Sequence, residues 1–279
     1  TQWSSSAASD VYKRQGLGDE AITLTDTTVG AAALIDLYTN GTSGIIDAST
    51  VHTITGTTAN ANTIYSQTST FTGLGTENIT IQGESSNTLA VASLNTLNGN
   101  TTGNINADTV TTLTGTISAL NTAYAASAST GDGISNLGDE AITLSDTSVT
   151  DVAALNTLNG NTTGLIDAGT NVTSFTGSIS ALNTMFAAAG DSGDKIDFGG
   201  TSGAATQTVT ISDTTDVSVT GLNTLNSTTT GNIDATNVTS LASASISDIK
   251  TLLTNGNNTT NHFVAVSYTH LRAHETIAD

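Results

Sequence analysis

The sequence predicts an α/β solenoid, in which strand–helix units of about 30 residues stack to form a parallel sheet. Three observations support this fold class. A motif of the form ALNTLNGNTTG recurs along the chain, short segments of alternating apolar residues precede it, and apolar residues at a spacing of three occur within it. A single unit of this size cannot bury its own apolar stripe, so we expect neighbouring units to cover it.

The recurring motif occupies four places. It reads SLNTLNGNTTG at Ser93–Gly103, ALNTLNGNTTG at Ala154–Gly164 and GLNTLNSTTTG at Gly221–Gly231, and a degenerate copy lies at Leu34–Gly44. The closing glycines are 59, 61 and 67 residues apart. A self-similar period of this kind is typical of stacked repeats. We therefore divide the array into four repeats of about 60 residues, with approximate bounds 16–71, 72–135, 136–193 and 194–260.

The two ends of the chain read differently from the repeats. Ser5–Gln15 (SSAASDVYKRQ) and Val266–Thr276 (VSYTHLRAHET) resemble in-frame translations of sequencing-library adapters. Such segments must be set aside before the fold is considered. We exclude 1–15 and 266–279 as adapter-derived, and we expect the remaining array, 16–265, to be an internal fragment of a longer protein.

The third repeat shows the first strand–helix unit most clearly. In Leu137–Thr147, the apolar residues Ile142 and Leu144 alternate with polar ones, which is the pattern of a half-buried strand. In the segment that follows, apolar residues at a spacing of three share one helical face. They are Val152, Leu155 and Leu158. We expect a helix here.

The ends of this helix also have sequence signals. Thr150 is a candidate N-cap, and Asn159–Gly160 favours a helix end because both residues tolerate the left-handed conformation. Asn and Thr are nevertheless poor helix formers. The alternative is that the ALNTL segments are loops and the fold is a right-handed parallel β-helix.

A second unit follows directly. Gly164–Ala168 (GLIDA) is a short predicted strand, and Ser178 is a candidate N-cap for a helix over Ser180–Ala188. Its apolar face consists of Ile179, Leu182 and Phe186, with Ile117, Leu120 and Tyr124 as counterparts in the second repeat. Strands that alternate with helices in this way are expected to be parallel.

The outer repeats are less regular. In the first repeat, the segment TANANTIYSQ (58–67) replaces the second helix. The fourth repeat carries an insertion, Gly190–Ala205, and ends on another predicted helical stripe of Ile246, Ile249 and Leu253.

Composition excludes several classes of function. The 279 residues include five Lys and Arg against 24 Asp and Glu, which gives a net charge of −19, and there is no Cys. Nucleic-acid binding requires cations that contact phosphates, and anionic membranes repel such a chain. No apolar run reaches the roughly 18 residues of a membrane span. We expect neither nucleic-acid binding nor membrane insertion, and without disulfides any order must come from stacking.

Two sets of acidic residues recur with the repeat. Asp26, Asp146 and Asp213 follow the first strand, while Asp47, Asp167 and Asp234, with Asn106 in the second repeat, follow the short strand. We interpret both sets as residues that bond neighbouring backbone N–H groups and fix turns. The alternative is a functional row of carboxylates along the stack.

The insertion holds the one candidate metal site. Gly190–Gly200 (GDSGDKIDFGG) resembles the Gly–Asp nonapeptides of secreted RTX proteins, whose turns bind calcium, although Lys195 stands where that pattern has Asp. The resemblance implies hard oxygen ligands for Ca²⁺ from Asp191, Asp194 and Asp197. The alternative is a solvated Gly–Asp turn, and the sequence implies no other cofactor.

The sequence does not predict an enzyme. It contains no Ser–His–Asp set, metal-spaced cluster or phosphate-binding loop. Instead, the motifs LGDEAITLSDT, ALNTLNGNTTG and VTTLTGTISALNTAYA are similar to those of very large Thr- and Asn-rich surface proteins of marine bacteria, especially cyanobacteria.

This resemblance implies a non-enzymatic spacer in a large extracellular or cell-surface, adhesin-like protein. Its partners would be neighbouring repeats of the same chain and, beyond these, cell-surface or glycan partners. The alternative is a calcium- or carbohydrate-binding module of an RTX-like protein.

Overall fold

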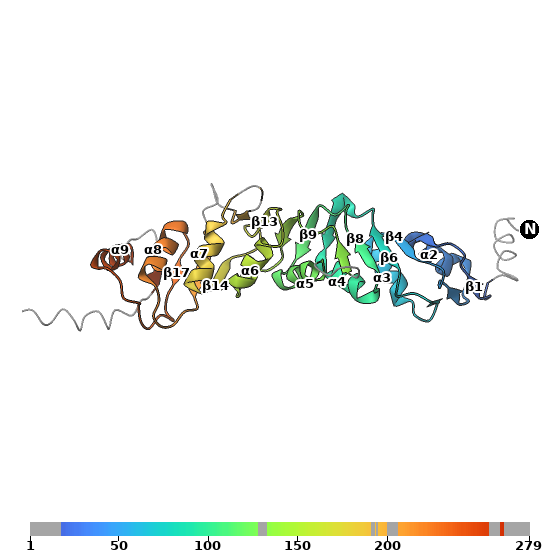
Figure 1. Ribbon diagram of the computed structural model, residues 1–279, viewed down its shortest axis with the longest axis horizontal. Coiled ribbons are helices and arrows are strands. Elements are labelled where there is room, and N and C mark those ends of the chain that lie inside the picture. The colour runs from blue at the N-terminus through green and yellow to red at the C-terminus, as the bar shows by residue number, and fades with distance from the viewer. Residues whose placement is uncertain are drawn as a thin grey trace, which may run out of the picture. The chain divides into compact units, whose positions relative to one another are not determined.

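The fold is an α/β solenoid of strand–helix coils with parallel sheets, as the sequence predicts (Figure 1). A computed structural model describes residues 18–127, 133–190, 193, 195–199, 206–256 and 263–264. Both adapter-like ends lie outside these residues. The chain divides into two compact units, 1–111 with 122–137 and 112–121 with 138–279.

The first unit contains two parallel sheets. One has the order β1-β3-β5, formed by β1 (Ile22–Thr23), β3 (Ile46–Asp47) and β5 (Phe71–Thr72). The other has the order β10-β8-β6-β4-β2. Its strands are β2 (Thr28–Gly30), β4 (Thr53–Gly56), β6 (Asn78–Ile81), β8 (Asn104–Asn106) and β10 (Gly133–Ser135). The strand β7 (Thr88–Ala90) also belongs to this unit.

The helices of the first unit follow the strands in each coil. They are α2 (Ala31–Asp36), which continues as the π-helix η1 (Leu37–Gly41), α3 (Thr58–Ser66), the 3-10 helix η2 (Ser85–Asn87) and α4 (Val91–Asn100). The helix α5 (Ile117–Ser127) contributes residues to both units.

The second unit repeats this plan. Its strands β9 (Thr112–Gly115), β11 (Ala141–Leu144), β13 (Ile166–Asp167) and β15 (Ile196–Asp197) pair in that order. The next sheet has the order β12-β14-β16-β17-β18. Its strands are β12 (Ser148–Val149), β14 (Ser174–Gly177), β16 (Thr208–Ile211), β17 (Ile233–Asp234) and β18 (Phe263–Val264). The helices are α6 (Val152–Asn159), α7 (Ile179–Ala187), α8 (Val219–Thr228) and α9 (Ile246–Gly256).

The core consists of ladders of apolar residues in matching strand positions. Ile54 pairs in register with Ile79, and Ile79 with Ile105, while Phe175 pairs with Val209. All five of these side chains are buried. Each helix adds a buried face to these ladders, such as Val152, Leu155 and Leu158 in α6. Because each coil places an apolar residue at the same register, successive coils bury one another's apolar stripe.

The coils of the second and third repeats alternate between three and two strands. Three strands precede α4 (β5, β6 and β7) and α6 (β10, β11 and β12), whereas two precede α5 and α7. In the outer repeats, two described strands precede α2, α3 and α8, and one precedes α9. Because of the extra strand, strands at equivalent positions in successive repeats belong to different sheets. The strands β1, β6, β11 and β16 accordingly lie in four different sheets. In the second and third repeats, the period of about 60 residues therefore combines one three-strand coil with one two-strand coil.

This alternation corrects the expectation of one strand for each helix. The short strands β12 and β14 are additional, and both lie in segments that the sequence analysis treated as connections. The helices over the ALNTL segments are present, so the parallel β-helix without helices is the wrong alternative.

Several helix ends and faces differ from expectation. The N-cap of α6 is Asp151, not Thr150, because the Asp151 carboxylate accepts from the N–H groups of Ala153 and Ala154. Gly160 ends this helix in the right-handed conformation rather than the left-handed one. The expected cap of α7 is confirmed, because the Ser178 side chain accepts from the Ala181 N–H.

Two expectations for the outer repeats are also wrong. The segment 58–67 does contain a helix, α3, which Thr57 caps and which buries Ala61 and Ile64. The stripe on α9 is not a buried face: Ile246 is 80% exposed and Leu253 38% exposed, whereas Leu252 is buried. No following helix covers these residues within the part of the chain that the structure describes.

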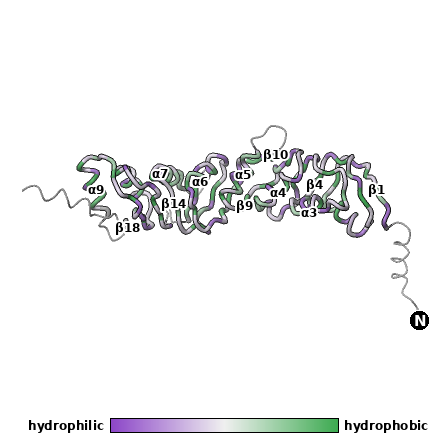
Figure 2. The backbone as a smooth tube through the Cα atoms, turned by 90° about the horizontal axis from the view of Figure 1, so that it is seen from below, coloured by the Kyte–Doolittle hydropathy of each residue, from purple (hydrophilic) through white to green (hydrophobic). Residues whose placement is uncertain are grey.

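The described helices are all short, and none is long and apolar enough to cross a lipid bilayer. Hydrophobic and hydrophilic residues alternate along the backbone at short intervals (Figure 2).

The closing glycine of each motif packs against the backbone of the preceding strand segment. A Cβ atom at Gly44, Gly103, Gly164 or Gly231 would overlap the carbonyl oxygen of Glu20, Glu77, Glu140 or Gln207, respectively. These positions therefore require glycine for close approach rather than for an unusual backbone conformation.

We predict that Gly103→Ala destabilises the protein by at least about 2 kcal/mol, because two backbone segments must separate to admit the methyl group. Gly99→Ala is the matched control, since a Cβ at Gly99 within α4 has no neighbour within 4 Å. That change should stabilise by about 0.5–1 kcal/mol. Chemical denaturation of both variants measures the difference, and equal midpoints would contradict it.

Candidate functional site

The proposed calcium ligands are only partly within the described structure. Asp191 and Asp194 lie outside the described residues. Asp197 ends β15, and its Oδ1 accepts from the Gly199 N–H at 2.7 Å. No group of three or more His, Cys, Asp or Glu that could hold a metal ion occurs among the described residues. In the described geometry, the Asp197 carboxylate takes part in a turn.

The row of acidic residues after the short strands consists of turn residues, as expected. Asp47, Asp167 and Asp234 each accept, through Oδ1, from the N–H two residues later, at 2.9–3.0 Å. Asn106 makes the same bond to the Asp108 N–H. An amide therefore performs the same task as a carboxylate at this position, which agrees with a structural role.

The row after the first strands has a different role from the expected one. The carboxylates of Asp146 and Asp213 accept from the backbone N–H of Ile117 and Ile179, at 2.8 and 2.6 Å. These N–H groups begin helices of the preceding coil, 29 and 34 residues away, rather than a local turn. In the first unit Glu84 takes this place and accepts from the Thr58 N–H at 2.7 Å.

These carboxylates complete helix N-termini that already have a cap. Thr57, Thr116 and Ser178 accept from the N–H three residues later in α3, α5 and α7. The carboxylate from the next coil satisfies a further N–H group and places negative charge at the positive end of the helix dipole. Helix capping and coil stacking are therefore the same contact.

A second set of contacts joins the helices themselves. An Asn side chain in one helix donates through Nδ2 to a backbone carbonyl in the next helix, at 2.9–3.0 Å. The five pairs are Asn62–Ser93, Asn121–Ala154, Asn156–Ala181, Asn183–Gly221 and Asn223–Asp248. Each accepting residue is the third residue of its helix. The Asn that connects successive helices belongs to an LNT motif in four of the five pairs and to Ala61-Asn62-Thr63 in the other.

The oxygen of this Asn is satisfied differently in different repeats. Asn62 Oδ1 accepts from Asn100 Nδ2 at 3.1 Å, and Asn121 Oδ1 accepts from Asn161 Nδ2 at 3.5 Å. Thr228 stands in the place of Asn100 and Asn161 in the fourth repeat. There the Asn183 Oδ1 is buried and has no hydrogen-bond partner in the structure.

The structure also buries acidic residues that the sequence analysis did not single out. Glu77 is fully buried and its Oε2 accepts from the Tyr65 O–H and the Gly75 N–H, both at 2.8 Å. Burial, followed by the negative charge of Glu77, raises the pKa of Tyr65. In the fourth repeat the neutral Gln207 occupies this buried position. In the sequence, the signal for this position is a Glu that recurs after Gly-Asp or Gly-Thr. Because the neutral Gln207 replaces it in the fourth repeat, the position has a structural role that does not require a charge.

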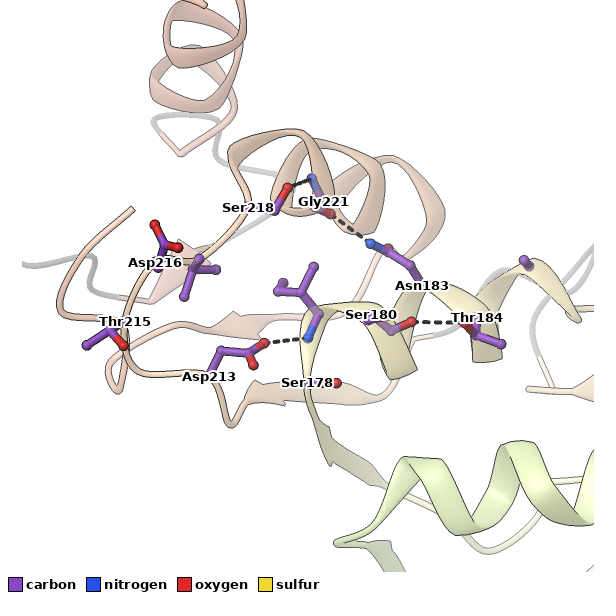
Figure 3. Close-up of a pocket in the computed structure, with 12 residues that line it drawn as sticks. Ser178, Ser180, Asn183, Thr184, Asp213, Thr215, Asp216, Ser218 and Gly221 are labelled. Carbon is purple, nitrogen blue, oxygen red and sulfur yellow. Dashed lines mark hydrogen bonds between the residues drawn. The ribbon is translucent and has the colours of Figure 1, made fainter. Parts of the chain in front are cut away.

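A groove of the second unit lies between α7 and α8 and has a volume of about 700 Å³. Figure 3 shows Asp213 directed at the first turn of α7 and Asn183 directed at Gly221. Ser178, Asp216 and Ser218 also line it. The lining residues include no His, Lys, Arg or aromatic residue. This set therefore contains no imidazole or amine base and no aromatic stacking platform for a sugar.

Comparisons with known proteins do not assign this arrangement: no protein-family model, curated protein or solved structure matches the chain.

The first prediction from this geometry concerns the unpaired amide oxygen. Thr228→Asn should donate to Asn183 Oδ1 and stabilise the protein by about 1 kcal/mol, because a buried acceptor gains its partner. Asn100→Thr is the matched reverse change and should destabilise by a similar amount. Thermal denaturation of both variants measures the effects. The proposed partnership would be wrong if Thr228→Asn gave the same gain after Asn183→Ala.

The second prediction concerns acid stability. The Thr236 hydroxyl, and then the Thr236 N–H, hold the pKa of Asp234 below 3.8. A lowered pKa means that this turn adds stability above pH 3.8 and loses it as the pH falls through the folded-state value. Carboxyl NMR titration should find the Asp234 midpoint below 3.8, and Thr236→Ala should raise it. An unchanged midpoint in the variant would exclude the hydroxyl as the main cause.

Proposed function

We propose that this chain is a non-enzymatic spacer segment of a large, secreted or cell-surface, adhesin-like protein. The observation that supports this most is the use of the recurring polar residues. Asn62, the LNT-motif Asn121 and the carboxylates Glu84, Asp146 and Asp213 all bond to the neighbouring coil. Residues that recur with the period therefore serve stacking, which is the requirement of a spacer.

Composition supports the proposed extracellular location. The chain carries a net charge of −19 and no Cys, so its order depends on neither disulfides nor a reducing compartment. Ions of a saline exterior would screen the repulsion between its acidic surfaces. The proposed partners are neighbouring repeats of the same parent chain, together with cell-surface or glycan partners outside this segment.

A display experiment tests the spacer directly. The full chain is placed between a cell-surface anchor and a binding tag, and capture of a ligand on an opposing surface is compared with that of a tag attached directly to the anchor. The spacer function predicts better capture with the chain present. The control displays the chain without the tag. Adhesion of that control to cells or to a glycan array would contradict the proposal and favour the carbohydrate-binding alternative.

The calcium alternative is tested separately. We predict that a calcium titration of the full chain produces no binding heat, and that its circular dichroism is the same in calcium and in excess chelator. The reason is that the carboxylates of Asp47, Asp146, Asp197 and Asp213 already accept backbone N–H groups. Secondary structure that is lost on chelation would contradict this prediction. If a variant with Asp191→Asn, Asp194→Asn and Asp197→Asn then lacked that structure even in calcium, the ions would be assigned to the insertion.

A further inference from the structure

Three coil junctions in the structure follow the same rule. A helix with a Ser or Thr cap presents two donors, the N–H of its first residue and the Asn side chain four residues later. The next coil supplies two acceptors, a carboxylate after a strand and the carbonyl of the third residue of its helix. At the junction of α7 with α8, the donors are Ile179 and Asn183, and the acceptors are Asp213 and Gly221.

The same rule holds at the other two junctions. Thr58 and Asn62 of α3 meet Glu84 and Ser93. Likewise, Ile117 and Asn121 meet Asp146 and Ala154. Both hydrogen bonds are present at each junction, so the pair of donors spaced by four residues is a recognition element that repeats through the array.

In the first coil that the structure describes, the acceptors meet no donor among the described residues. Asp26 occupies the position of Asp146 after β1, and Ala33 is the third residue of α2. Asp26 is exposed and accepts no hydrogen bond from any described residue. The two residues line a cavity of about 370 Å³ together with the apolar residues Leu24, Val29, Leu34 and Leu37.

Another helix has the donors without the acceptors. The helix α9 carries the same Ser cap, because Ser245 Oγ accepts from the Asp248 N–H. Its first residue is Ile246, and Lys250 stands four residues later, in the place of Asn183. Among the described residues, the Ile246 N–H has no acceptor. The ammonium of Lys250 is also a hydrogen-bond donor, on a longer side chain than that of Asn and with a positive charge added.

The apolar parts of the two surfaces also correspond. The side chains of Ile117 and Ile179, which begin α5 and α7, are each 6% exposed, whereas Ile246 is 80% exposed. The internal junction shows where this side chain packs, since a Cβ on Gly221 would overlap Ile179. Ala33 is the counterpart of Ala154, the residue at the α5 junction where Ile117 is buried, so the closer approach seen at Gly221 is not required. Transfer of Ile246 into the cavity beside Ala33 would remove its exposed apolar surface from water.

We propose that α9 of one copy of this chain docks against β1 and α2 of a second copy, head to tail. The Ile246 N–H and Lys250 take the donor positions, and Asp26 and the Ala33 carbonyl take the acceptor positions. Asp36 lies in the same cavity lining and adds a second negative charge opposite Lys250. This contact joins two different surfaces, so it leaves a free donor end and a free acceptor end on each dimer. It requires no cell-surface location, and its failure would leave the spacer function untouched.

Sedimentation velocity of the full chain over a range of concentrations tests the contact. The unmodified chain should form dimers and larger species as its concentration rises. Asp26→Lys removes the acceptor end and Lys250→Glu removes the donor end, so each variant alone should associate at least about tenfold more weakly, because like charges then face each other. An equimolar mixture keeps one intact donor end and one intact acceptor end. It should therefore form one-to-one dimers and nothing larger.

Matched charge changes elsewhere provide the controls. Asp108→Lys and Lys195→Glu alter exposed residues outside both surfaces and should associate like the unmodified chain. Circular dichroism of every variant checks that the fold is retained. The proposal is overturned if the unmodified chain remains monomeric, if the two end variants associate like the controls, or if their mixture forms no dimer.

Discussion

The hydrogen bond from an Asn side chain to the backbone of the next helix is the contact on which the stacking of these coils depends. Neighbouring parallel strands lie about 4.8 Å apart, whereas packed helices usually need 8–10 Å between axes. A coil that contains both must reconcile the two spacings. Small residues at the third helical position, Ser93, Ala154, Ala181 and Gly221, allow close approach. The Asn side chain of the preceding helix then reaches the backbone carbonyl of this small residue.

These helices need such contacts because they are weak on their own. They are 6–11 residues long and rich in Asn, Thr and Ser, and isolated helices of that length and composition are barely stable in water. Each of α3, α5 and α7 receives a cap from its own Ser or Thr and a carboxylate from the next coil. Secondary structure and coil stacking therefore form together, so an unstacked coil would lose the bonds that define its helix.

Much of this architecture can be predicted from the sequence, but the connections between coils cannot. The apolar spacing of Val152, Leu155 and Leu158 predicts α6 and its buried face correctly, because a helix must present residues three and four apart on one side. The strands β12 and β14 were missed because two to four residues carry too little periodicity. The helix α3 was missed because Thr and Asn in TANANTIYS favour turns locally, and tertiary contacts override that preference.

The same limit applies to the candidate site. Recurrence of Asp146 and Asp213 indicates a structural role, but only the three-dimensional arrangement shows that their bonds cross to the preceding coil. This arrangement also explains how a chain of net charge −19, with only Lys195 and Lys250 as described cations, can stack at all. At each junction the negative charge meets a helix N-terminus, and the other bond uses a neutral amide. The junctions therefore need no cations, and acidic residues are tolerated wherever a backbone N–H group meets them.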